Sequence, residues 1–568
     1  MPTYEWKIKE EPAAEKREKL AADLNVSGKI AGLLLQRGIT TYDEAKSFFR
    51  PALEMLNDPF LMKDMEKAVS RLEKAIEANE KILLFGDYDV DGTTSVALTY
   101  LFFSGLTSNI DYYIPDRYRE GYGVSFLGID YAAENGFSLI VSLDCGIRSV
   151  DHVKYAADKG IDFIICDHHL PGSVIPQAVA ILDAKQDDCA YPYKELSGCG
   201  VGFKLCQAFV GKHNMSYDRL TSLLDLLAVS ISCDIVQMTG ENRVLAALGL
   251  QKINSDPRPG IKVLLDYNQK ATYTVNELVF TAGPRINAAG RLADAKAAVR
   301  LLIEEKEEEA REMVVGLNDN NKVRQSLDQS ITRGALAMIE QESGFESRSS
   351  TVVYNPGWHK GIIGIVASRL IEQHYRPTIV LTQHEGKITG SARSVAGFDI
   401  HGAIEKCAEH LIQFGGHTHA AGLSMLEDRV NAFREAFERA VSSSIAEHQK
   451  KPFIEVDTEI WFSEIDDKFI RILLQMGPFG PGNMNPVFVT RRIKDTGYAK
   501  QMGSSGEHLK FNAMKDGRYY GAIAFGFGHY YQDLKEGRFF DICYHIEQST
   551  FNNRTSTELR VLDMKPVE

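Results

Sequence analysis

The sequence has no CxxC pair, no long uncharged apolar run and no excess of positive charge. Its eight cysteines are scattered over 568 residues, which argues against a structural zinc site and a disulfide scaffold, so we expect a reducing, cytoplasmic setting. No stretch of about 18 uncharged apolar residues is present, so no membrane span is expected. The opening residues are charged and have no apolar core, and no signal peptide is expected from them.

Acidic residues outnumber basic ones. The chain has 64 Lys and Arg against 77 Asp and Glu, a formal net charge of −13, which makes a protein that coats nucleic acid by bulk positive charge an unfavourable interpretation. Any nucleic-acid binding must come from local basic patches or from bound cations. With 44% hydrophobic and 25% charged residues, the composition is that of a globular chain of roughly three or four domains.

The pattern of apolar residues changes along the first half of the chain. Residues 1–79 are predicted to be helical, with a capping box at Thr41 and Glu44. Over residues 80–291, short apolar runs alternate with helical stretches, which is typical of a parallel sheet with helices on both faces. Residues 292–345 include EEKEEEAREM and are predicted to form a long connecting helix with a solvated acidic face.

A second alternating unit and a β-rich segment follow. Within residues 346–450, TVVYNPGWHKGIIGIVASRL predicts a strand, a loop and a helix, and PTIVL predicts the next strand. Within residues 451–568, a Gly- and Pro-rich turn or linker begins at Met476, and short alternating strands run from PVFVTRRI to ELRVL. The predicted fold class is therefore α/β, with a parallel-sheet core, a second α/β domain and a small C-terminal β-barrel.

Acidic and histidine residues follow the predicted strands of the first sheet. They are Asp87, Asp89 and Asp91 in GDYDVDG, Asp144 in DCG, and Asp167, His168 and His169 in DHH. A fourth apolar run, LLDLLAVSISC, ends at Asp234, and its periodicity fits either a strand or a buried helix. Because the carboxyl ends of parallel strands share one edge, where ligands bind, at least three of these motifs should converge.

Converging carboxylates require cations between them. Each pair about 4 Å apart costs about 4 kcal/mol at an effective dielectric constant of about 20. Asp and His ligands without Cys suit Mn²⁺ or Mg²⁺, and the number of carboxylates suggests two ions, which suits an in-line displacement at phosphorus. The alternative is that these residues cap helices, as Asp91 would before GTTSVAL. The recurrence at three strand ends favours the metal interpretation.

These motifs occur in the same order as in a known protein family. GDYDVDG, DCG and DHH resemble the DHH phosphoesterase superfamily. GPRINAAGR (283–291), SARS (391–394) and GGHTHAAG (415–422) narrow the resemblance to the RecJ family of single-strand-specific exonucleases. The resemblance implies a DHH core over 80–291, a DHHA1 domain over 346–450 and an OB-fold over 451–568.

The resemblance also implies roles for the acidic motifs. It places the metal ligands at Asp89, Asp91, Asp144, His168 and Asp234. Asp87 is expected to support the site or orient the attacking water, and His169 to orient a ligand or contact the scissile phosphate. The expected cofactors are two divalent cations, with Mn²⁺ preferred over Mg²⁺.

Residues of PDRYREGYG and of the later motifs are candidates for binding the substrate, because the planar guanidinium of arginine binds phosphate bidentately and glycine permits close backbone approach. The candidates are Arg117, Arg285, Asn287, Arg291, Ser391, Arg393, Gly415, Gly416 and His417. The resemblance assigns the reading of a 5′ phosphate to Ser391 and Arg393. The alternatives are surface salt bridges for the arginines and a tight turn with a structural histidine for GGHTHAAG.

The function implied by the resemblance is a 5′→3′ exonuclease that degrades single-stranded DNA to 5′-mononucleotides in repair and recombination. Single-stranded DNA is the expected partner, and a single-strand-binding protein and a RecQ-type helicase are expected from the family alone. The alternatives are a DHH phosphodiesterase for short oligonucleotides or cyclic dinucleotides, and an inactive replication scaffold. In the barrel, Phe488 and Phe511 fit base stacking and ordinary core packing equally well.

Overall fold

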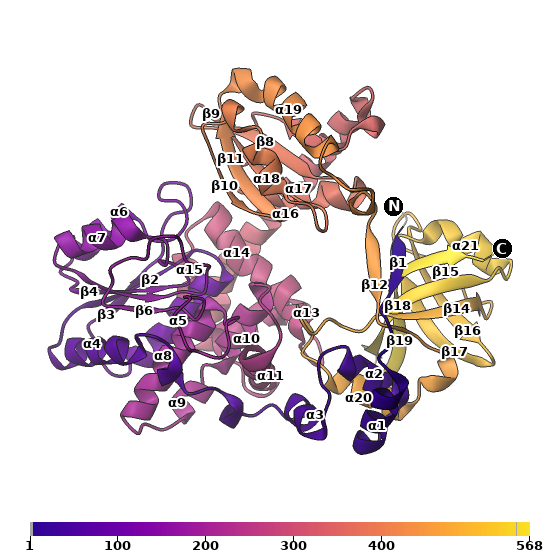
Figure 1. The fold of residues 1–568 in the computed structure, drawn as a ribbon, viewed down its shortest axis with the longest axis horizontal. Coiled ribbons are helices and arrows are strands. Elements are labelled where there is room, and N and C mark those ends of the chain that lie inside the picture. The colour runs from indigo at the N-terminus through magenta and orange to yellow at the C-terminus, as the bar shows by residue number, and fades with distance from the viewer. Residues whose placement is uncertain (1–3, 552–553, 568) are drawn as a thin grey trace. The chain divides into compact units, whose positions relative to one another are not determined.

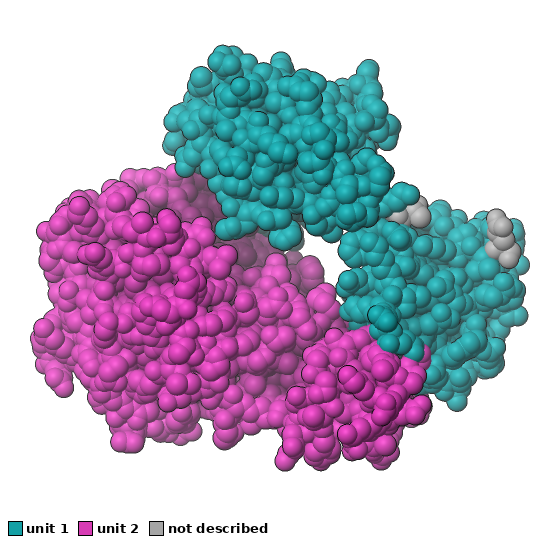
Figure 2. Space-filling view, viewed as in Figure 1, with its two compact units in different colours: residues 1–11, 322–465, 486–568 teal, residues 12–321, 466–485 magenta. Residues whose placement is uncertain are grey.

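A computed structural model describes residues 4–551 and 554–567 of the chain. The chain divides into two compact units (Figure 2). Unit 1 comprises residues 1–11, 322–465 and 486–568, and unit 2 comprises residues 12–321 and 466–485. None of the helices in the described ranges is long and apolar enough to cross a membrane.

Unit 2 is built on a five-stranded parallel sheet with the order β3-β2-β4-β5-β6 (Figure 1). The strands are β2 (Ile82–Gly86), β3 (Ile110–Tyr113), β4 (Leu139–Leu143), β5 (Asp162–Cys166) and β6 (Ala180–Leu182). Four of them are the strands predicted from apolar runs. The edge strand β3 was missed because its sequence, IDYY, is short and only its first residue is buried.

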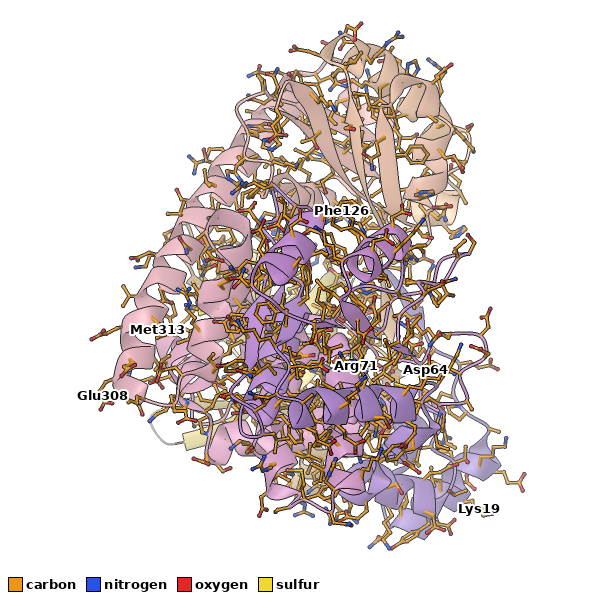
Figure 3. All side chains as sticks on the ribbon, turned by 90° about the vertical axis from the view of Figure 1, so that its left-hand side faces the viewer. Lys19, Asp64, Arg71, Phe126, Glu308 and Met313 are labelled. Carbon is orange, nitrogen blue, oxygen red and sulfur yellow. The ribbon has the colours of Figure 1, made fainter. Side chains whose placement is uncertain are left out.

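Alternate residues of the sheet pack on helices above and below it. Leu83 and Phe85 of β2 belong to a core cluster with Ile129 of α6 (Phe126–Glu134) and with α7 (Val150–Asp158). Ile82 and Leu84 point to the other face, into a cluster with α4 (Met65–Glu77), α5 (Val90–Phe103) and α8 (Gly198–Lys212). The prediction of helices on both faces is confirmed (Figures 1 and 3).

The fourth apolar run is a helix, α10 (Leu224–Cys233), so Asp234 follows a helix and not a strand. Its residues from Leu224 to Ser232 are all buried, which explains why no amphipathic period marks it in the sequence. Other helical segments complete this unit: α9 (Asp218–Thr221), α11 (Gly240–Ser255), α12 (Pro259–Leu265), α13 (Val275–Glu277), a π-helical turn η4 (Leu278–Ala282), α14 (Gly283–Leu292) and α20 (Asp467–Gln475).

The N-terminal segment is helical with one exception. It contains α1 (Ala14–Leu24), α2 (Gly28–Leu35) and α3 (Tyr42–Phe49), and the predicted capping box of Thr41 and Glu44 is present at α3. The expectation that residues 1–79 are helical fails at β1 (Glu5–Ile8), which pairs in parallel with β12 (Phe453–Val456). That pairing joins residues more than 400 positions apart, and a local pattern does not reveal such a partner.

The predicted single connecting helix is two helices, α15 (Lys296–Ile303) and α16 (Glu307–Gln341). The chain turns at Glu304, whose carboxylate accepts hydrogen bonds from the amides of Glu305 and Lys306. Beyond the turn, α16 is a long helix with an exposed acidic face, as predicted, on which Figure 3 labels Glu308. The boundary between the two units falls inside α16, after residue 321.

The α/β part of unit 1 is a five-stranded sheet with the order β10-β11-β9-β8-β7. Its strands are β7 (Thr351–Tyr354), β8 (Thr378–His384), β9 (Lys387–Arg393), β10 (Gln413–His417) and β11 (Ala420–Met425). The second half of α16 and α17 (Ile363–Gln373) pack on one face, and α18 (Ile400–Glu405) and α19 (Val430–Ser442) pack on the other. The predicted strand, loop, helix and next strand are β7, α17 and β8 with the loop between them.

The C-terminal part of unit 1 is a closed five-stranded barrel, as predicted, in which β14 pairs with β18, β18 with β19, β19 with β17, β17 with β16 and β16 with β14. Its strands are β14 (Phe488–Asp495), β16 (His508–Lys515), β17 (Arg518–Ala524), β18 (Phe540–Phe551) and β19 (Arg554–Pro566), with β13 (Thr458–Glu459), β15 (Lys500–Met502) and α21 (Tyr531–Lys535) added around them. Phe488 and Phe511 are fully buried, so they are core residues and not a base-stacking platform.

Candidate active site

The carboxyl ends of three neighbouring strands bring the acidic motifs into one row. Gly86 of β2 pairs with Leu143 of β4, and Leu143 pairs with Cys166 of β5. The residue that follows each of these is an aspartate, namely Asp87, Asp144 and Asp167. The predicted convergence at one sheet edge is therefore a consequence of strand register.

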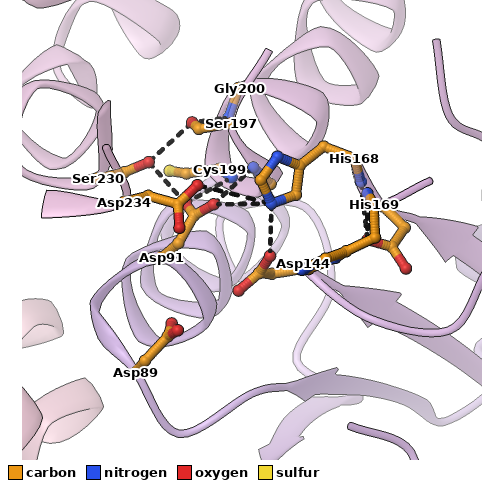
Figure 4. Close-up of polar contacts among 12 residues, drawn as sticks. Asp89, Asp91, Asp144, His168, His169, Ser197, Cys199, Gly200, Ser230 and Asp234 are labelled. Atoms are coloured by element: carbon orange, nitrogen blue, oxygen red, sulfur yellow. Dashed lines mark hydrogen bonds and ion pairs between the residues drawn. The ribbon is translucent and has the colours of Figure 1, made fainter. Parts of the chain in front are cut away.

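His168 lies at the centre of the resulting cluster (Figure 4). Its Nε2 atom is 3.1 Å from Oδ1 of Asp144, 3.6 Å from Oδ2 of Asp234 and 3.7 Å from Oδ2 of Asp91. The ligand atoms of Asp91, His168 and Asp234 all lie within 4.8 Å of one another, and so do those of Asp144, His168 and His169. Two overlapping groups of this size, sharing His168, match the chemistry of a divalent-cation site.

Asp91 is held by the start of α8. Its carboxylate accepts hydrogen bonds from the amides of Gly198 at 2.6 Å and Cys199 at 3.0 Å, and from the hydroxyl of Ser230 at 2.6 Å. Helix N-termini favour such anions. A Cβ on Gly198 would lie 2.6 Å from Cβ of Asp144, so glycine is required where the start of α8 meets the DCG motif.

In the GDYDVDG motif, the residue that caps a helix is Asp89 and not Asp91. Asp89 is the N-cap of α5, and its Oδ1 accepts a hydrogen bond from the amide of Gly92 at 3.1 Å. In Figure 4, Asp89 lies apart from the side chains that surround His168. Asp91 does not cap α5, since its carboxylate points to α8.

Asp234 is presented by the C-terminal end of α10. A carboxylate is unfavourable there, because the helix dipole places partial negative charge at that end. The next residue, Ile235, has a φ of 61°, a left-handed conformation that β-branched residues rarely adopt. Asp144 also has a positive φ, of 61°. Backbone strain of this kind is typical of functional sites.

Several buried polar atoms of the cluster have no hydrogen-bond partner among the described residues. They are Oδ2 of Asp87, Oδ1 of Asp144, both ring nitrogens of His168 and Oδ2 of Asp234. Buried polar atoms are almost always paired, and three of these, Oδ1 of Asp144, Nε2 of His168 and Oδ2 of Asp234, lie close together. A divalent cation fits this set of donors, because it would both coordinate unpaired atoms and offset the like charges.

Burial and neighbouring negative charges raise the pKa values of three carboxyl groups of the cluster. Burial, followed by the charges of Asp91 and Asp89, raises the pKa of Asp234 to about 9. Burial and the same two carboxylates raise the pKa of Asp144 well above its usual range. Burial and the charge of Asp89 do the same for Asp87. Without a cation, the site therefore retains protons at neutral pH.

His169 is oriented by a buried aspartate that the sequence prediction left without a role. Asp167 accepts hydrogen bonds from the amides of Ile147, His168 and His169 and lies 2.7 Å from Nδ1 of His169. Burial opposes ionisation of Asp167, but the contact with His169 and the amide hydrogen bonds lower its pKa to about 2. On the other side, the hydroxyl of Tyr122 lies 3.1 Å from Nε2 of His169. An exposed tyrosine carries no periodicity or charge that would mark it in a sequence.

Two of the predicted phosphate-binding residues in unit 2 lie beside the first acidic motif. The guanidinium of Arg117 lies 4.9 Å from the ring centroid of Tyr88. The main-chain oxygen of Arg291 accepts a hydrogen bond from Tyr118 at 2.5 Å. A Cβ on Gly290 would lie 2.5 Å from the oxygen of Tyr88, so the glycine before Arg291 lets α14 approach this motif.

Arg285 and Asn287, which lie on α14, are buried and half-buried candidates respectively. Arg285 is 4% exposed, its Nε donates to Asn318 at 2.7 Å and its Nη1 donates to the carbonyl of Thr281 at 2.5 Å. Its guanidinium also lies 3.9 Å from the ring centroid of Tyr267. Arg285 is therefore engaged within the protein, and Asn287 is half-buried two residues later.

Four of the five predicted residues of unit 1, Ser391, Arg393, Gly415 and His417, share one face of its sheet. Strand register places Arg393 beside Ala420 and Ala420 beside His417. It places Ser391 beside Gly422 and Gly422 beside Gly415. Gly416 lies between these rows, with a φ of 147°.

The start of α17 reaches this face. A Cβ on Gly364 would lie 2.9 Å from Oγ of Ser391 and 3.0 Å from Nη2 of Arg393. Nη1 of Arg393 donates to Oγ of Ser391 at 3.2 Å. The SARS and GGHTHAAG motifs therefore form one group, with Gly364 as a neighbour that the sequence prediction did not include.

Comparison with known proteins assigns each domain. The "DHH family, N-terminal domain" matches residues 81–231, the "DHHA1 domain" matches residues 348–443 and the "RecJ OB domain" matches residues 456–563. Among solved structures, RecJ in complex with Mn²⁺ from Thermus thermophilus superposes with a TM-score of 0.83 at 25% identity, over 99% of this chain and 80% of that one. A RecJ exonuclease bound to manganese gives 0.60 at 30% identity, over 70% and 99%.

Two curated relatives, both named single-stranded-DNA-specific exonuclease RecJ, match along almost the whole chain. The protein of Haemophilus influenzae is 32% identical over 547 residues, which cover 92% of this chain and 94% of the relative. The protein of Bacillus subtilis is 34% identical over 563 residues, which cover 98% of this chain and 70% of the relative. With this identity and with the three domain matches in sequence, the chain belongs to the RecJ family.

Proposed function

We propose that this chain is a metal-dependent 5′→3′ exonuclease that degrades single-stranded DNA to 5′-mononucleotides. The observation that carries the proposal is the buried group of Asp144, His168 and Asp234, whose potential ligand atoms converge at the carboxyl edge of the sheet and have no hydrogen-bond partner among the described residues. Family membership supports it, because the curated relatives bear the name of single-stranded-DNA-specific exonucleases.

Two divalent cations, Mn²⁺ or Mg²⁺, would be held by Asp89, Asp91, Asp144, His168 and Asp234. Their presence would supply Lewis-acid stabilisation of charge on the phosphate. Asp87 would orient water at the site, since its Oδ2 is unpaired while its Oδ1 accepts the amide of Gly123 at 3.3 Å. His169 would contact the scissile phosphate, and Asp167 fixes its ring.

Each unit carries its own candidate contacts for the substrate backbone. In unit 2, Arg117 and Arg291 lie next to the metal motif and suit phosphate contacts. Arg285 would act by holding α14 in place, and Asn287 remains a candidate substrate contact. In unit 1, the 5′ phosphate would be read on the face that carries Ser391, Arg393, Gly415 and His417, with Gly416 between the last two in the strand.

The domain limits proposed for this activity remain 80–291 for the DHH core, 346–450 for DHHA1 and 451–568 for the OB-fold. A role in DNA repair and recombination, in the cytoplasm and with a single-strand-binding protein and a RecQ-type helicase, is proposed from family membership. The inactive-scaffold alternative is disfavoured, because every expected ligand is present.

End-labelled single strands test the proposal. With Mn²⁺, a 5′-labelled strand should release labelled mononucleotide from the first turnover, whereas a 3′-labelled strand should release its label last. Asp144→Ala should abolish release while the far-UV circular dichroism stays unchanged. Equal attack on duplex DNA, faster turnover of dinucleotides than of long strands, or full activity in excess chelator would overturn the proposal.

A further inference from the structure

A fourth strand end contributes to the edge that carries the acidic motifs. Cys166 of β5 pairs with Leu182 of β6, so Asp183 occupies the same row as Asp167. The amide of Asp167 donates to the carbonyl of Leu182 at 3.0 Å, which ties the DHH motif to the end of β6. Lys185 follows two residues later and is not part of any motif discussed above.

The turn that carries Lys185 is fixed by side chains. Oδ1 of Asp183 accepts the amide of Lys185 at 2.7 Å. Nε2 of Gln186 donates to the carbonyls of Ile181 at 3.0 Å and Asp183 at 3.1 Å. Both Asp183 and Gln186 are buried. The backbone of Lys185 is therefore held rigidly beside the DHH motif, as expected for a residue with a positional role.

The side chain of Lys185 is held only loosely. It is 20% exposed, and its Nζ lies 3.8 Å from Oε2 of Glu195, whose own side chain is 45% exposed. A pair of this length and exposure contributes little. Glu195 lies three residues before Gly198, whose amide donates to the carboxylate of Asp91 at 2.6 Å. The pair with Glu195 therefore directs the ammonium group of Lys185 toward the segment that leads to the ligand Asp91.

We propose that Lys185 binds a non-bridging oxygen of the scissile phosphate and stabilises the negative charge that develops on it during cleavage. A flexible ammonium with three donors can follow that oxygen as the geometry at phosphorus changes. The inference rests on the proposed hydrolysis, in which the oxygen of water bonds to phosphorus, the bond from phosphorus to the 3′ oxygen breaks, and that oxygen takes up a proton. Lys185 stays protonated and forms no covalent bond.

A competing role is that Lys185 only offsets the charge of the acidic cluster before cations bind. The two roles differ in what they predict for metal binding and for the rate. A group that contacts substrate affects the rate when the metal is saturating, and its removal does not weaken Mn²⁺ binding. A group that only offsets charge affects Mn²⁺ binding and leaves the rate at saturation unchanged.

The test measures Mn²⁺ affinity, from the paramagnetic resonance of free Mn²⁺, and the single-turnover rate on a 5′-labelled single strand at saturating Mn²⁺. Lys185→Met should cleave about 100-fold more slowly than the wild type, with an unchanged or tighter Mn²⁺ dissociation constant. Lys185→Arg should recover part of the rate. Lys159→Met is the matched control, because Lys159 precedes β5 at the opposite edge of the sheet and pairs with Asp130 at 2.9 Å. It should cleave at the wild-type rate.

If the wild type is active and the Lys185→Met variant cleaves at the wild-type rate, this inference alone is overturned. Tighter Mn²⁺ binding with a normal rate at saturation would overturn it in favour of charge compensation. A wild type that releases no nucleotide with Mn²⁺ would overturn the proposed function and this inference together.

Discussion

The hydroxyl of Tyr122 lies 3.1 Å from Nε2 of His169, and Oδ1 of Asp167 lies 2.7 Å from Nδ1 of the same ring. The imidazole is therefore held from both sides. Asp167 is ionised and accepts a hydrogen bond from Nδ1. Tyr122 also lies 3.2 Å from the carbonyl of Asp144, so its hydroxyl links the DHH motif to the DCG motif.

Replacing Tyr122 by Phe removes this link but keeps the ring. We expect kcat to fall by about fivefold, because a net hydrogen bond is worth about 1 kcal/mol and that energy orients His169. KM should change little, which steady-state kinetics on single strands would show. Tyr118→Phe is the control, since its hydroxyl contacts the main chain of Arg291 and not His169. A wild-type kcat for Tyr122→Phe would contradict the orienting role.

Replacing Ser230 by Ala should weaken Mn²⁺ binding by about 10–100-fold, the usual effect of removing a group that orients a ligand. The hydroxyl of Ser230 donates to Oδ1 of Asp91 at 2.6 Å. Ser232→Ala is the matched control, because Ser232 lies on the same helix and its hydroxyl has no hydrogen-bond partner among the described residues. Equal Mn²⁺ affinity in the two variants, measured by isothermal titration calorimetry, would contradict this arrangement of Asp91.

The stabilisation that Mn²⁺ provides should increase with pH. Asp234 has a pKa of about 9 in the folded, metal-free protein and of about 4 when unfolded. The folded state therefore binds more protons between these values, and the metal-free protein loses stability as pH rises through this window. Mn²⁺ displaces those protons, so it binds more tightly at higher pH.

Thermal unfolding measures this effect. The rise in Tm caused by a fixed Mn²⁺ concentration should be larger at about pH 8.5 than at about pH 6.5. Asp234→Asn should flatten the dependence, because it removes the group that titrates. An equal rise in Tm at both pH values in the wild type would show that protons and Mn²⁺ do not compete for these carboxylates.

Lys204 should be essential for stability although it has no part in the chemistry. It is fully buried, and its Nζ donates to Glu241 at 2.8 Å, Gln207 at 2.6 Å and the carbonyl of Asn57 at 2.8 Å. Lys204→Met leaves a buried carboxylate without its partner and should reduce the free energy of unfolding by about 3–5 kcal/mol.

Urea unfolding followed by circular dichroism would measure that loss. Lys212→Met is the control, since Lys212 lies on the same helix and forms more exposed ion pairs with Glu66 and Glu73, which contribute little. Equal stability of the two variants would mean that the buried pair adds no more than a surface pair.

The sequence predicted the parts of the fold that local patterns encode. Strands β2, β4 and β5 appear as short apolar runs, and the aspartate after each run marks the shared edge. The helical nature of α10 was not decided, because a helix that is buried on all sides has no amphipathic period. The pairing of β1 with β12 was missed, because its hydrogen bonds join segments far apart in the chain.

The sequence motifs indicated which residues are candidate metal ligands, but not which residues orient those ligands. Asp91, Asp144 and His168 carry motif spacing, so their convergence follows from a parallel sheet. The contacts of Tyr122 with His169 and of Ser230 with Asp91 depend on side-chain directions that no spacing encodes. The burial of Arg285 against Asn318 likewise requires the packing of α14 on α16.

The central claim is that side chains from separate strand and helix ends hold divalent metal at one edge of the sheet. Anomalous diffraction from crystals soaked in Mn²⁺ tests it most directly. We predict anomalous peaks among the carboxylates of Asp91, Asp144 and Asp234 and the ring of His168, which are absent from crystals of the Asp144→Ala variant. Crystals with no peak at this position, or with manganese bound only elsewhere, would contradict the account.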